Sequence, residues 1–239
     1  AHYKDKLNSG NSYAVRWKAH DVSNELLTFY KMNYAKNYDD YTEAISTYQC
    51  PAQNMIFACN NGDIAIKQQG QFPAKWYRQG EFIMPGYDSS YAWRGYINDT
   101  TGLMMHNPSR GFVSSANQYP YDPQVYPYYM NGSFALTRGI VINKTLTALS
   151  NITAEDMENL QKNNYNLLAQ WARPLLLKYT DVSALNATEQ NFLDIFKNWN
   201  LYNNPEEKGA TVFKVWWGVL MEETYGDEFA QSGLPLDMP

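Results

Sequence analysis

The sequence has 239 residues, of which 44% are hydrophobic and 18% are charged, which is enough to bury a real core in one large or two small domains. Its net charge of −5 argues against a protein that follows nucleic-acid phosphates or binds membranes through a polybasic surface. Every apolar run is well below the roughly 18 residues that a membrane-spanning helix needs. We therefore expect a globular chain with no membrane span and no nucleic-acid partner.

Two helices are predicted near the beginning of the chain. Ser23, Asn24 and Glu25 precede a pair of leucines, which is typical of a capped helix start, and this helix is expected to run to about Ala35. A second helix is predicted from about residue 39, and its apolar positions recur on one face: Tyr41, Ala44 and Ile45.

A β-hairpin is predicted next. Residues 53–58 and 63–67 are apolar runs on either side of Asn61-Gly62, and Asn-Gly between two such runs is a strong hairpin signal. Cys50 and Cys59 stand at the two ends of the first strand. If that strand is extended, its ends are too far apart for a disulfide bridge, so we expect two free thiols.

The middle of the chain is rich in turns and ends in one polar strand. Residues 70–107 contain many prolines and glycines and predict a long irregular connection, which is often functional in a compact domain. A strand is then predicted over 112–116, where Phe112-Val113 is followed by small polar residues. This strand ends at Asn117, because prolines follow it.

The last part of the chain is predicted to be helical. Thr153 and Asp156 form a capping-box pattern, and further helices are expected over 167–177, 192–199 and 210–225, with Pro174 kinking or dividing the first of these. We therefore divide the chain into an α+β portion, residues 1–145, and a helical portion, residues 146–239.

No complete catalytic or cofactor site is recognisable from residue types and spacing alone. The chain has no Gly-rich phosphate loop and no G-x-S-x-G motif, and His2, His20 and His106 lack metal-ligand spacing. The acidic pairs are better explained as solvated helix positions than as a glycosidase pair. The 20 Tyr and 7 Trp leave one alternative open, a non-catalytic module that binds glycans or peptides through an aromatic surface.

Four stretches, in the right order, resemble the penicillin acylase family of N-terminal-nucleophile hydrolases. They are the hairpin A-Q-N-M-I-F-A-C-N-N-G-D-I-A-I (52–66), P-G-Y-D-S-S-Y-A-W-R-G (85–95), N-P-S-R-G-F-V-S-S-A-N (107–117), and the arginine of A-L-T-R-G-I (135–140). The resemblance covers about residues 13–225. It implies an internal part of the large catalytic chain, with an α+β fold that belongs to a four-layer αββα sandwich and is followed by a helical region.

The resemblance also implies an activity. Family members cleave the linear amide of N-acyl compounds, such as a penicillin or cephalosporin side chain or an acyl-homoserine lactone. Their nucleophile is a Ser, Thr or Cys at the N-terminus of the mature chain, so Ala1 does not fit that role and we expect the nucleophile upstream. The isolated chain is then expected to be inactive, the parent protein periplasmic or secreted, and the partners a small N-acyl amide and the remaining acylase chains. Unpaired apolar surface on the fragment would favour a homodimer.

The resemblance assigns roles to four residues. Asn117 matches the asparagine that donates a hydrogen bond to the oxyanion, and Arg138 matches an arginine that orients it. Phe29 and Gln53 match positions that line the acyl pocket in relatives. From the residues alone, Asn117 could simply close a loop, Arg138 could be a surface residue, and Phe29 could belong to the core.

No cofactor is required by this interpretation. The calcium-binding aspartate of the family aligns near Tyr128, so calcium is conceivable in the parent protein but has no support in this segment, although Asp122 is close in sequence. We therefore predict no metal site in this chain.

Overall fold

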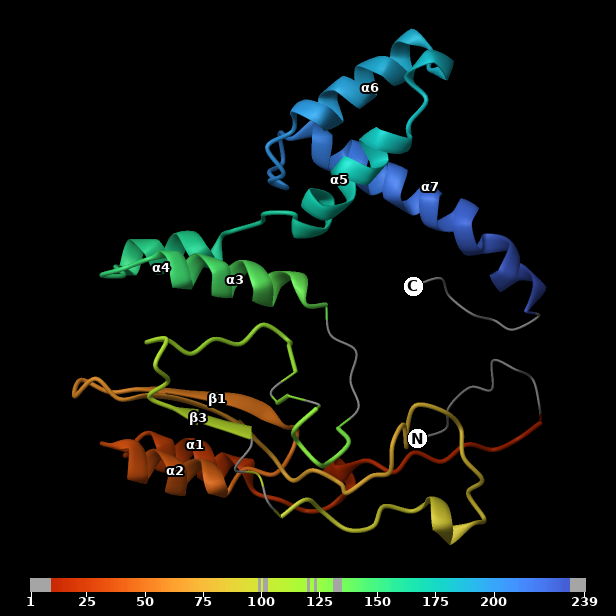
Figure 1. Cartoon of the computed structure of the whole chain (residues 1–239). Helices are drawn as coiled ribbons and strands as arrows, with labels where there is room; N and C mark the ends of the chain where they lie inside the picture. Colours follow the sequence, from red (N-terminus) through yellow and green to blue (C-terminus); the bar gives the residue numbers. More distant parts are fainter. Residues whose placement is uncertain are drawn as a thin grey trace. The chain divides into compact units, whose positions relative to one another are not determined.

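The computed structural model describes residues 10–98, 100, 103–119, 121–122, 124–130 and 135–232. The chain divides into two compact units, one formed mostly by Ala14–Thr147 and the other mostly by Ala148–Pro239 (Figure 1). The first unit combines helices with a small sheet, and the second is helical. The expected division into residues 1–145 and 146–239 of one catalytic chain stays a prediction.

Both predicted N-terminal helices are present. A single 3₁₀ turn, η1 (Lys18–His20), precedes α1 (Glu25–Met32), and α2 (Tyr38–Ser46) follows. Each helix is capped by an asparagine: the side chain of Asn24 accepts from the Leu27 amide, and that of Asn37 accepts from the Asp40 amide. These caps satisfy backbone donors that the first helical turn leaves without partners.

The sheet has three antiparallel strands in the order β1-β2-β3. They are β1 (Gln53–Ala58), β2 (Ile64–Gln69) and β3 (Met104–His106). The predicted hairpin is confirmed, with Ala58 opposite Ile64 and the expected Asn61-Gly62 inside the loop. Gly62 has a φ of 96°, which favours glycine at that place.

The predicted strand at 112–116 is wrong. The third strand is instead Met104–His106, which pairs with β2 and ends just before Asn107. Asn107 has a φ of 43°, in the left-handed region, so the chain turns out of the ladder there. Residues 112–115 belong to no strand of the described sheet, and the side chains of Ser114 and Ser115 make hydrogen bonds instead.

One face of the sheet is covered by α1 and α2, as Figure 1 shows. The core beneath them consists of Tyr41, Ile45, Tyr48, Met55 and Ala65. The hydroxyl of Tyr41 donates to the carbonyl of Met55 at 2.7 Å, so the one polar atom of this buried ring is satisfied. The three predicted apolar positions of α2 are all buried, which confirms that face of the helix.

The other face of the sheet remains partly open. Ile56, Ile66 and Met105 form one row across the three strands, because they are directly paired. Ile56 is 52% exposed and Met105 is 40% exposed. The expected leftover apolar surface is therefore present on this face, whereas dimerisation through it stays a prediction.

A helix that the sequence analysis did not predict closes the first unit. It is α3 (Thr137–Ala148), which begins one residue before Arg138. Its early residues include Gly139 and the β-branched run 140–142, which have low helix propensity and hide the helix in the sequence. Tertiary contacts of these first turns, described below, outweigh the propensity.

The second unit contains α4 (Ala154–Gln161), α5 (Leu167–Tyr179), the 3₁₀ turn η4 (Val182–Ala184), α6 (Ala187–Asn198) and α7 (Lys208–Gln231). The predicted capping box of Thr153 and Asp156 is confirmed. Pro174 lies inside α5, which is assigned as one uninterrupted helix, so the proline does not divide it.

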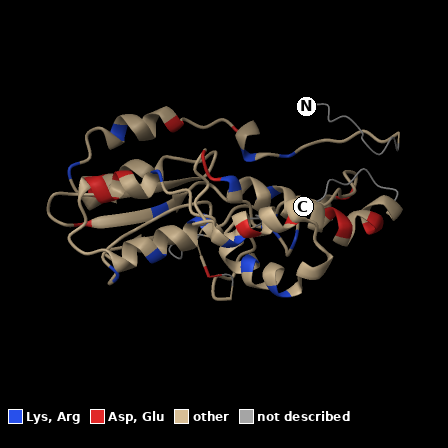
Figure 2. Cartoon of the chain, turned by 90° about the horizontal axis from the view of Figure 1, so that it is seen from above, with Lys and Arg blue, Asp and Glu red and all other residues tan. Residues whose placement is uncertain are grey.

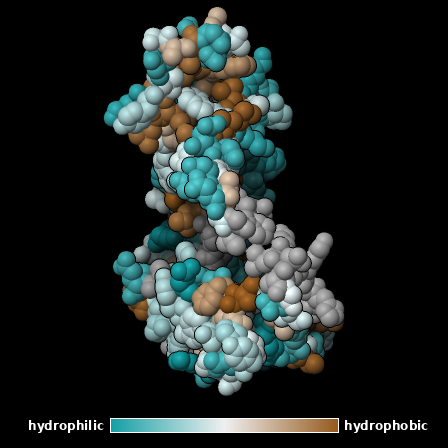
Figure 3. All heavy atoms as spheres, turned by 90° about the vertical axis from the view of Figure 1, so that its right-hand side faces the viewer, coloured by the Kyte–Doolittle hydropathy of each residue, from teal (hydrophilic) through white to brown (hydrophobic). Residues whose placement is uncertain are grey.

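The core of the second unit is aromatic, and its packing requires one glycine. It consists of Ala169, Ala172, Phe196, Trp199 and Phe213. A Cβ atom on Gly209 would approach the Trp199 ring to 2.3 Å, so α7 can pass this ring only with glycine there. Apolar side chains also reach the surface of this unit, where Figure 3 shows them in brown.

The charged residues and the two cysteines have no unusual arrangement in the described part of the chain. Lys, Arg, Asp and Glu are interspersed along the described chain, as Figure 2 shows. Cys50 and Cys59 are both free, as expected. Among the described residues, no helix is long and apolar enough to cross a membrane.

Candidate active site

Asn107 fixes the start of the segment that leads to Asn117. Its amide donates to the Ile64 carbonyl at 2.9 Å, and its side-chain oxygen accepts from the Ile64 amide, also at 2.9 Å. Its side-chain nitrogen donates to Asp63 at 2.8 Å. This bond and one from Asn61 hold the pKa of the Asp63 carboxyl below its usual range, so the carboxylate remains a charged anchor.

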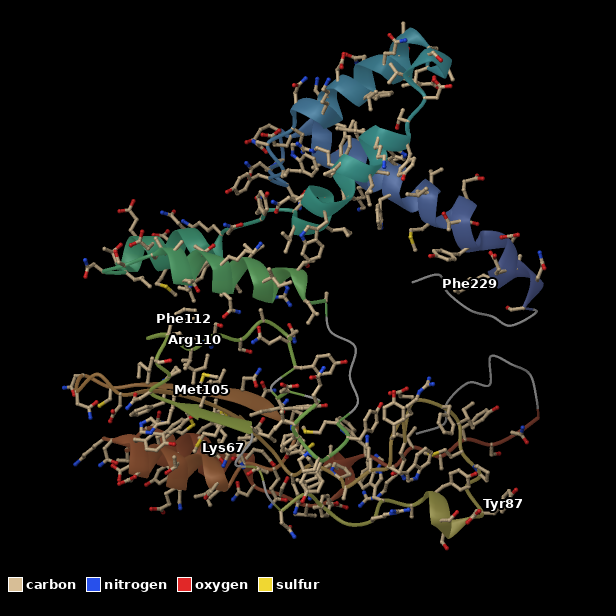
Figure 4. The ribbon with its side chains drawn as sticks, viewed as in Figure 1. Lys67, Tyr87, Met105, Arg110, Phe112 and Phe229 are labelled. Carbon is tan, nitrogen blue, oxygen red and sulfur yellow. The ribbon has the colours of Figure 1, made fainter. Side chains whose placement is uncertain are left out.

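Residues 110–118 then run over the sheet face that α1 and α2 leave open. Met55 points into the helix-covered core, so the side chain of its neighbour Asn54 points to the opposite face. Asn54 donates from Nδ2 to the Ser115 hydroxyl at 2.6 Å. Figure 4 shows Arg110 and Phe112 on this segment, between the sheet that carries Met105 and helix α3.

Helix α3 contacts the same segment from its other side. Asn143 accepts through Oδ1 from Arg110 Nη1 at 3.1 Å and from Ser114 Oγ at 3.2 Å. Arg138 donates from Nη2 to Asn117 Oδ1 at 2.6 Å. We call these contacts, together with the Asn54–Ser115 bond, the polar seam.

The Arg138 contact orients the Asn117 carboxamide. A guanidinium has donors and no acceptor, so the atom that it contacts must be the amide oxygen. The amide nitrogen, Nδ2, therefore points away from Arg138, and among the described residues it has no hydrogen-bond partner. Both side chains are exposed in the described part of the chain.

The backbone of Asn117 is in the left-handed region, with a φ of 51°. Asparagine tolerates this conformation better than most residues. The preceding residue, Ala116, is buried, so the chain is anchored immediately before the exposed carboxamide. The segment that carries Asn117 is thus held both by its side-chain contacts and by packing.

A shallow pocket lies beside this pair. It has a volume of about 300 Å³ and is lined by Gln118, Leu136, Gly139, Ile140, Asn143 and Lys144. Two of its lining residues, Gln118 and Gly139, directly follow Asn117 and Arg138 in sequence. The lining residues include neither Phe29 nor Gln53.

Phe29 and Gln53 lie on the helix-covered side of the sheet. Phe29 belongs to α1, is 49% exposed and meets the ring of Tyr48 edge-on at 6.0 Å. Gln53 begins β1 on the same face as Met55, opposite Gln69. No hydrogen bond joins either residue to Asn117 or Arg138 in the described part of the chain, so their place in an acyl pocket stays a prediction.

Asp122 acts as a turn residue in this structure. Its side chain accepts from the Gln124 amide at 2.9 Å, and its carbonyl accepts from the amides of Val125 and Tyr126. Within the described ranges, no group of three or more His, Cys, Asp or Glu side chains is placed to hold a metal ion.

Asn143, Asn54 and Ser115 were not singled out from the sequence. Asn143 could not be identified because α3 was not predicted. Its role depends on its position on the side of α3 that contacts residues 110–118. Ser115 was visible as part of a small polar run, and Asn54 as the asparagine that follows Gln53 in the hairpin. Their pairing needs the fold, because 61 positions separate them.

The arrangement of helices and strands is similar to that of a solved structure. The chain superposes on the thermostable penicillin G acylase from Alcaligenes faecalis with a TM-score of 0.61 and 18% identity, covering 84% of this chain and 37% of that one. The chain therefore has the α+β fold of the part of that acylase which it covers.

Residues 3–237 match the penicillin amidase family, and the chain belongs to that family. An acyl-homoserine lactone acylase, QuiP, of Pseudomonas fluorescens is 27% identical over 113 residues, which are 46% of this chain and 14% of that protein. The QuiP acylase of Pseudomonas syringae pv. tomato is 22% identical over 168 residues, 70% of this chain and 20% of the relative. The chain thus matches one fifth or less of the length of these two relatives.

Proposed function

We propose that this chain is part of an amidohydrolase that cleaves the linear amide of an N-acyl compound, with Asn117 Nδ2 as an oxyanion donor. The observation that carries the proposal is the Arg138–Asn117 contact, which turns Nδ2 away from Arg138, so that this donor has no partner among the described residues. The nucleophile and its α-amine are supplied by a segment upstream of this chain. The isolated chain is then inactive.

The chemistry assigned to Asn117 follows from charge development. When a nucleophile attacks the amide carbonyl, the carbonyl oxygen becomes negative, and a fixed neutral donor stabilises this oxyanion more than the ground-state carbonyl. Arg138 holds the amide in the donating orientation before attack, so no reorganisation is needed during the reaction. It acts on the oxyanion through Asn117 and is therefore a positioning residue.

The names of the relatives support the proposed substrate class. Two QuiP proteins are named acyl-homoserine lactone acylases, and the structural neighbour is a penicillin G acylase. We therefore place N-acyl-homoserine lactones and the side-chain amides of penicillins and cephalosporins in the substrate class. A periplasmic or secreted location is part of this proposal. The alternative of an aromatic binding module has less support, because several tyrosines are used in packing, such as Tyr41 in the core and Tyr38 stacked on His106 at 3.7 Å.

The proposal is tested by comparing two asparagines in the full-length protein that contains this chain. Asn117 and Asn151 are both exposed and both left-handed, with φ of 51° and 52°, so replacement by alanine has a similar backbone cost. Asn117→Ala is expected to lower kcat roughly 100- to 1000-fold for a fatty-acyl or phenylacetyl amide. Asn151→Ala is expected to leave kcat unchanged. Equal activity of the two variants would contradict the role of Asn117, and turnover by the isolated chain would contradict the need for an upstream nucleophile.

A further inference from the structure

We propose that Asn143 is a positioning residue for the oxyanion donor, because it ties the segment that carries Asn117 to the helix that carries Arg138. This inference rests on the proposed function. It adds a residue on α3, five positions after Arg138, that acts on the oxyanion only through the segment carrying Asn117.

Asn143 uses both ends of its carboxamide. Its oxygen accepts two hydrogen bonds, from Arg110 and Ser114, and a carbonyl oxygen has two lone pairs for this purpose. Its nitrogen donates to the Gly139 carbonyl at 2.7 Å, one turn back along α3. This last bond fixes the side chain in the direction that meets the segment.

The bonded residues are close in sequence to the proposed donor and its partner. Ser114 precedes Asn117 by three residues, and Gly139 directly follows Arg138. The helix and the segment also approach closely at this level, since a Cβ atom on Gly139 would come within 2.6 Å of Gln118 Oε1. A displacement of the segment at Asn143 is therefore passed to the Asn117–Arg138 pair.

Arg110 is itself held in place on the segment. Its guanidinium lies over the Phe112 ring at 4.5 Å from the ring centre, and its Nε donates to the Phe112 carbonyl at 2.9 Å (Figure 4). Asn143 thus meets a donor that is already oriented, which costs less side-chain entropy on contact. Because both Asn143 and Arg110 are held by other contacts, their hydrogen bond fixes the position of the segment relative to α3.

The test uses kcat and KM of the full-length protein with three variants. Asn143→Ala removes both accepted bonds and also improves helix propensity, so any loss cannot be assigned to a weaker helix. Asn143→Asp keeps the acceptor oxygen. Asn198→Ala is the matched control, because Asn198 makes the same bond from Nδ2 to the carbonyl one turn back, that of Asp194, at the end of α6.

We expect Asn143→Ala to lower kcat roughly 10- to 100-fold, since displacements near 1 Å have effects of that size, with KM within about twofold. Asn143→Asp is expected to retain most of the activity, and Asn198→Ala all of it. In an Asn117→Ala background, Asn143→Ala should lower kcat less than about twofold, because groups that act through one another are not additive. Unchanged kcat in Asn143→Ala, or an equal loss in both backgrounds, would overturn the inference.

A failure of the proposed function is distinguishable from a failure of this inference. If the full-length wild type hydrolyses no N-acyl amide, the proposed function fails. The contact of Asn143 with residues 110–118 is then tested by a structural measurement that does not depend on activity. Amide hydrogen exchange over residues 111–118 is expected to be faster in Asn143→Ala than in Asn198→Ala. Equal exchange in the two variants would show that Asn143 does not hold the segment.

Discussion

The two faces of the three-stranded sheet are covered in different ways. Helices α1 and α2 cover one face with a closed apolar core that includes Ile45 and Met55. Residues 110–118 cover part of the other face through the polar seam, whose hydrogen bonds join side chains that are mostly exposed. Apolar burial stabilises a fold but gives no direction, whereas hydrogen bonds are directional and individually weak in water. The core under α1 and α2 therefore contributes most to the stability of the fold, whereas the polar seam sets the orientation of side chains such as Asn117.

The largest expected effect on stability is in the core. Ile45 is fully buried, and Ile45→Ala is expected to lower the free energy of unfolding by about 3 kcal/mol, because it removes buried apolar contacts and leaves a cavity. Ile56 makes a matched control on the opposite face, where its side chain is 52% exposed. Ile56→Ala is expected to cost less than about 1 kcal/mol. Urea unfolding of the isolated chain measures both, and similar losses would contradict the difference between the faces.

A smaller effect is expected from a polar group in this core, the hydroxyl of Tyr41. Burial raises the pKa of the Tyr41 hydroxyl to about 12, and this hydroxyl donates to the Met55 carbonyl. Tyr41→Phe is expected to lower the free energy of unfolding by about 1–2 kcal/mol at pH 8, because the buried carbonyl loses its partner. The measurement is again urea unfolding.

The same raised pKa predicts a pH dependence. The folded chain holds the Tyr41 proton more tightly than the unfolded chain, whose tyrosine pKa is about 10. The contribution is therefore complete below pH 10 and is lost as the pH rises from about 10 towards 12. The stability difference between wild type and Tyr41→Phe should shrink over that range, and a constant difference would show that this hydroxyl does not titrate as described.

The smallest effect on stability is expected in the seam. Ser115→Ala removes the acceptor for Asn54 and is expected to change the free energy of unfolding by less than about 1 kcal/mol, because the bond is exposed. In the full-length protein the same change is expected to lower kcat several-fold, since the bond positions the segment two residues before Asn117. Ser46→Ala serves as a control, because its hydroxyl donates to the Glu43 carbonyl within the same helix, α2. A large loss of stability with unchanged kcat would reverse the roles assigned to the seam and the core.

Much of the apolar face could be predicted from the sequence. The helix starts at residues 23–25 and near 39, and the hairpin around Asn61-Gly62, depend on local periodicity, caps and turn residues, which a sequence displays directly. The third strand was misplaced because Phe112-Val113 has a strand-like composition, whereas ladder pairing at 104–106 depends on long-range contacts.

Only part of the polar seam could be predicted from the sequence. The Asn117–Arg138 contact was expected because both residues match positions of the family, and the structure confirms the contact while their chemical roles stay proposals. Asn143 depends on α3, which was hidden by Gly139 and the β-branched residues after it. Side-chain bonds between segments some 30 or 60 positions apart, such as Arg110–Asn143 and Asn54–Ser115, leave no periodic pattern to detect.

Every contact of the seam runs between two side chains, whereas the neighbouring sheet is joined by its backbone. A backbone ladder tolerates many changes of residue type, but a side-chain contact exists only while both partners are kept. The architecture and the orientation of its polar groups can therefore change at different rates during evolution. The architecture is still shared with a penicillin G acylase at 18% identity, with a TM-score of 0.61. Each hydrogen bond of the seam, in contrast, can be lost through a single substitution.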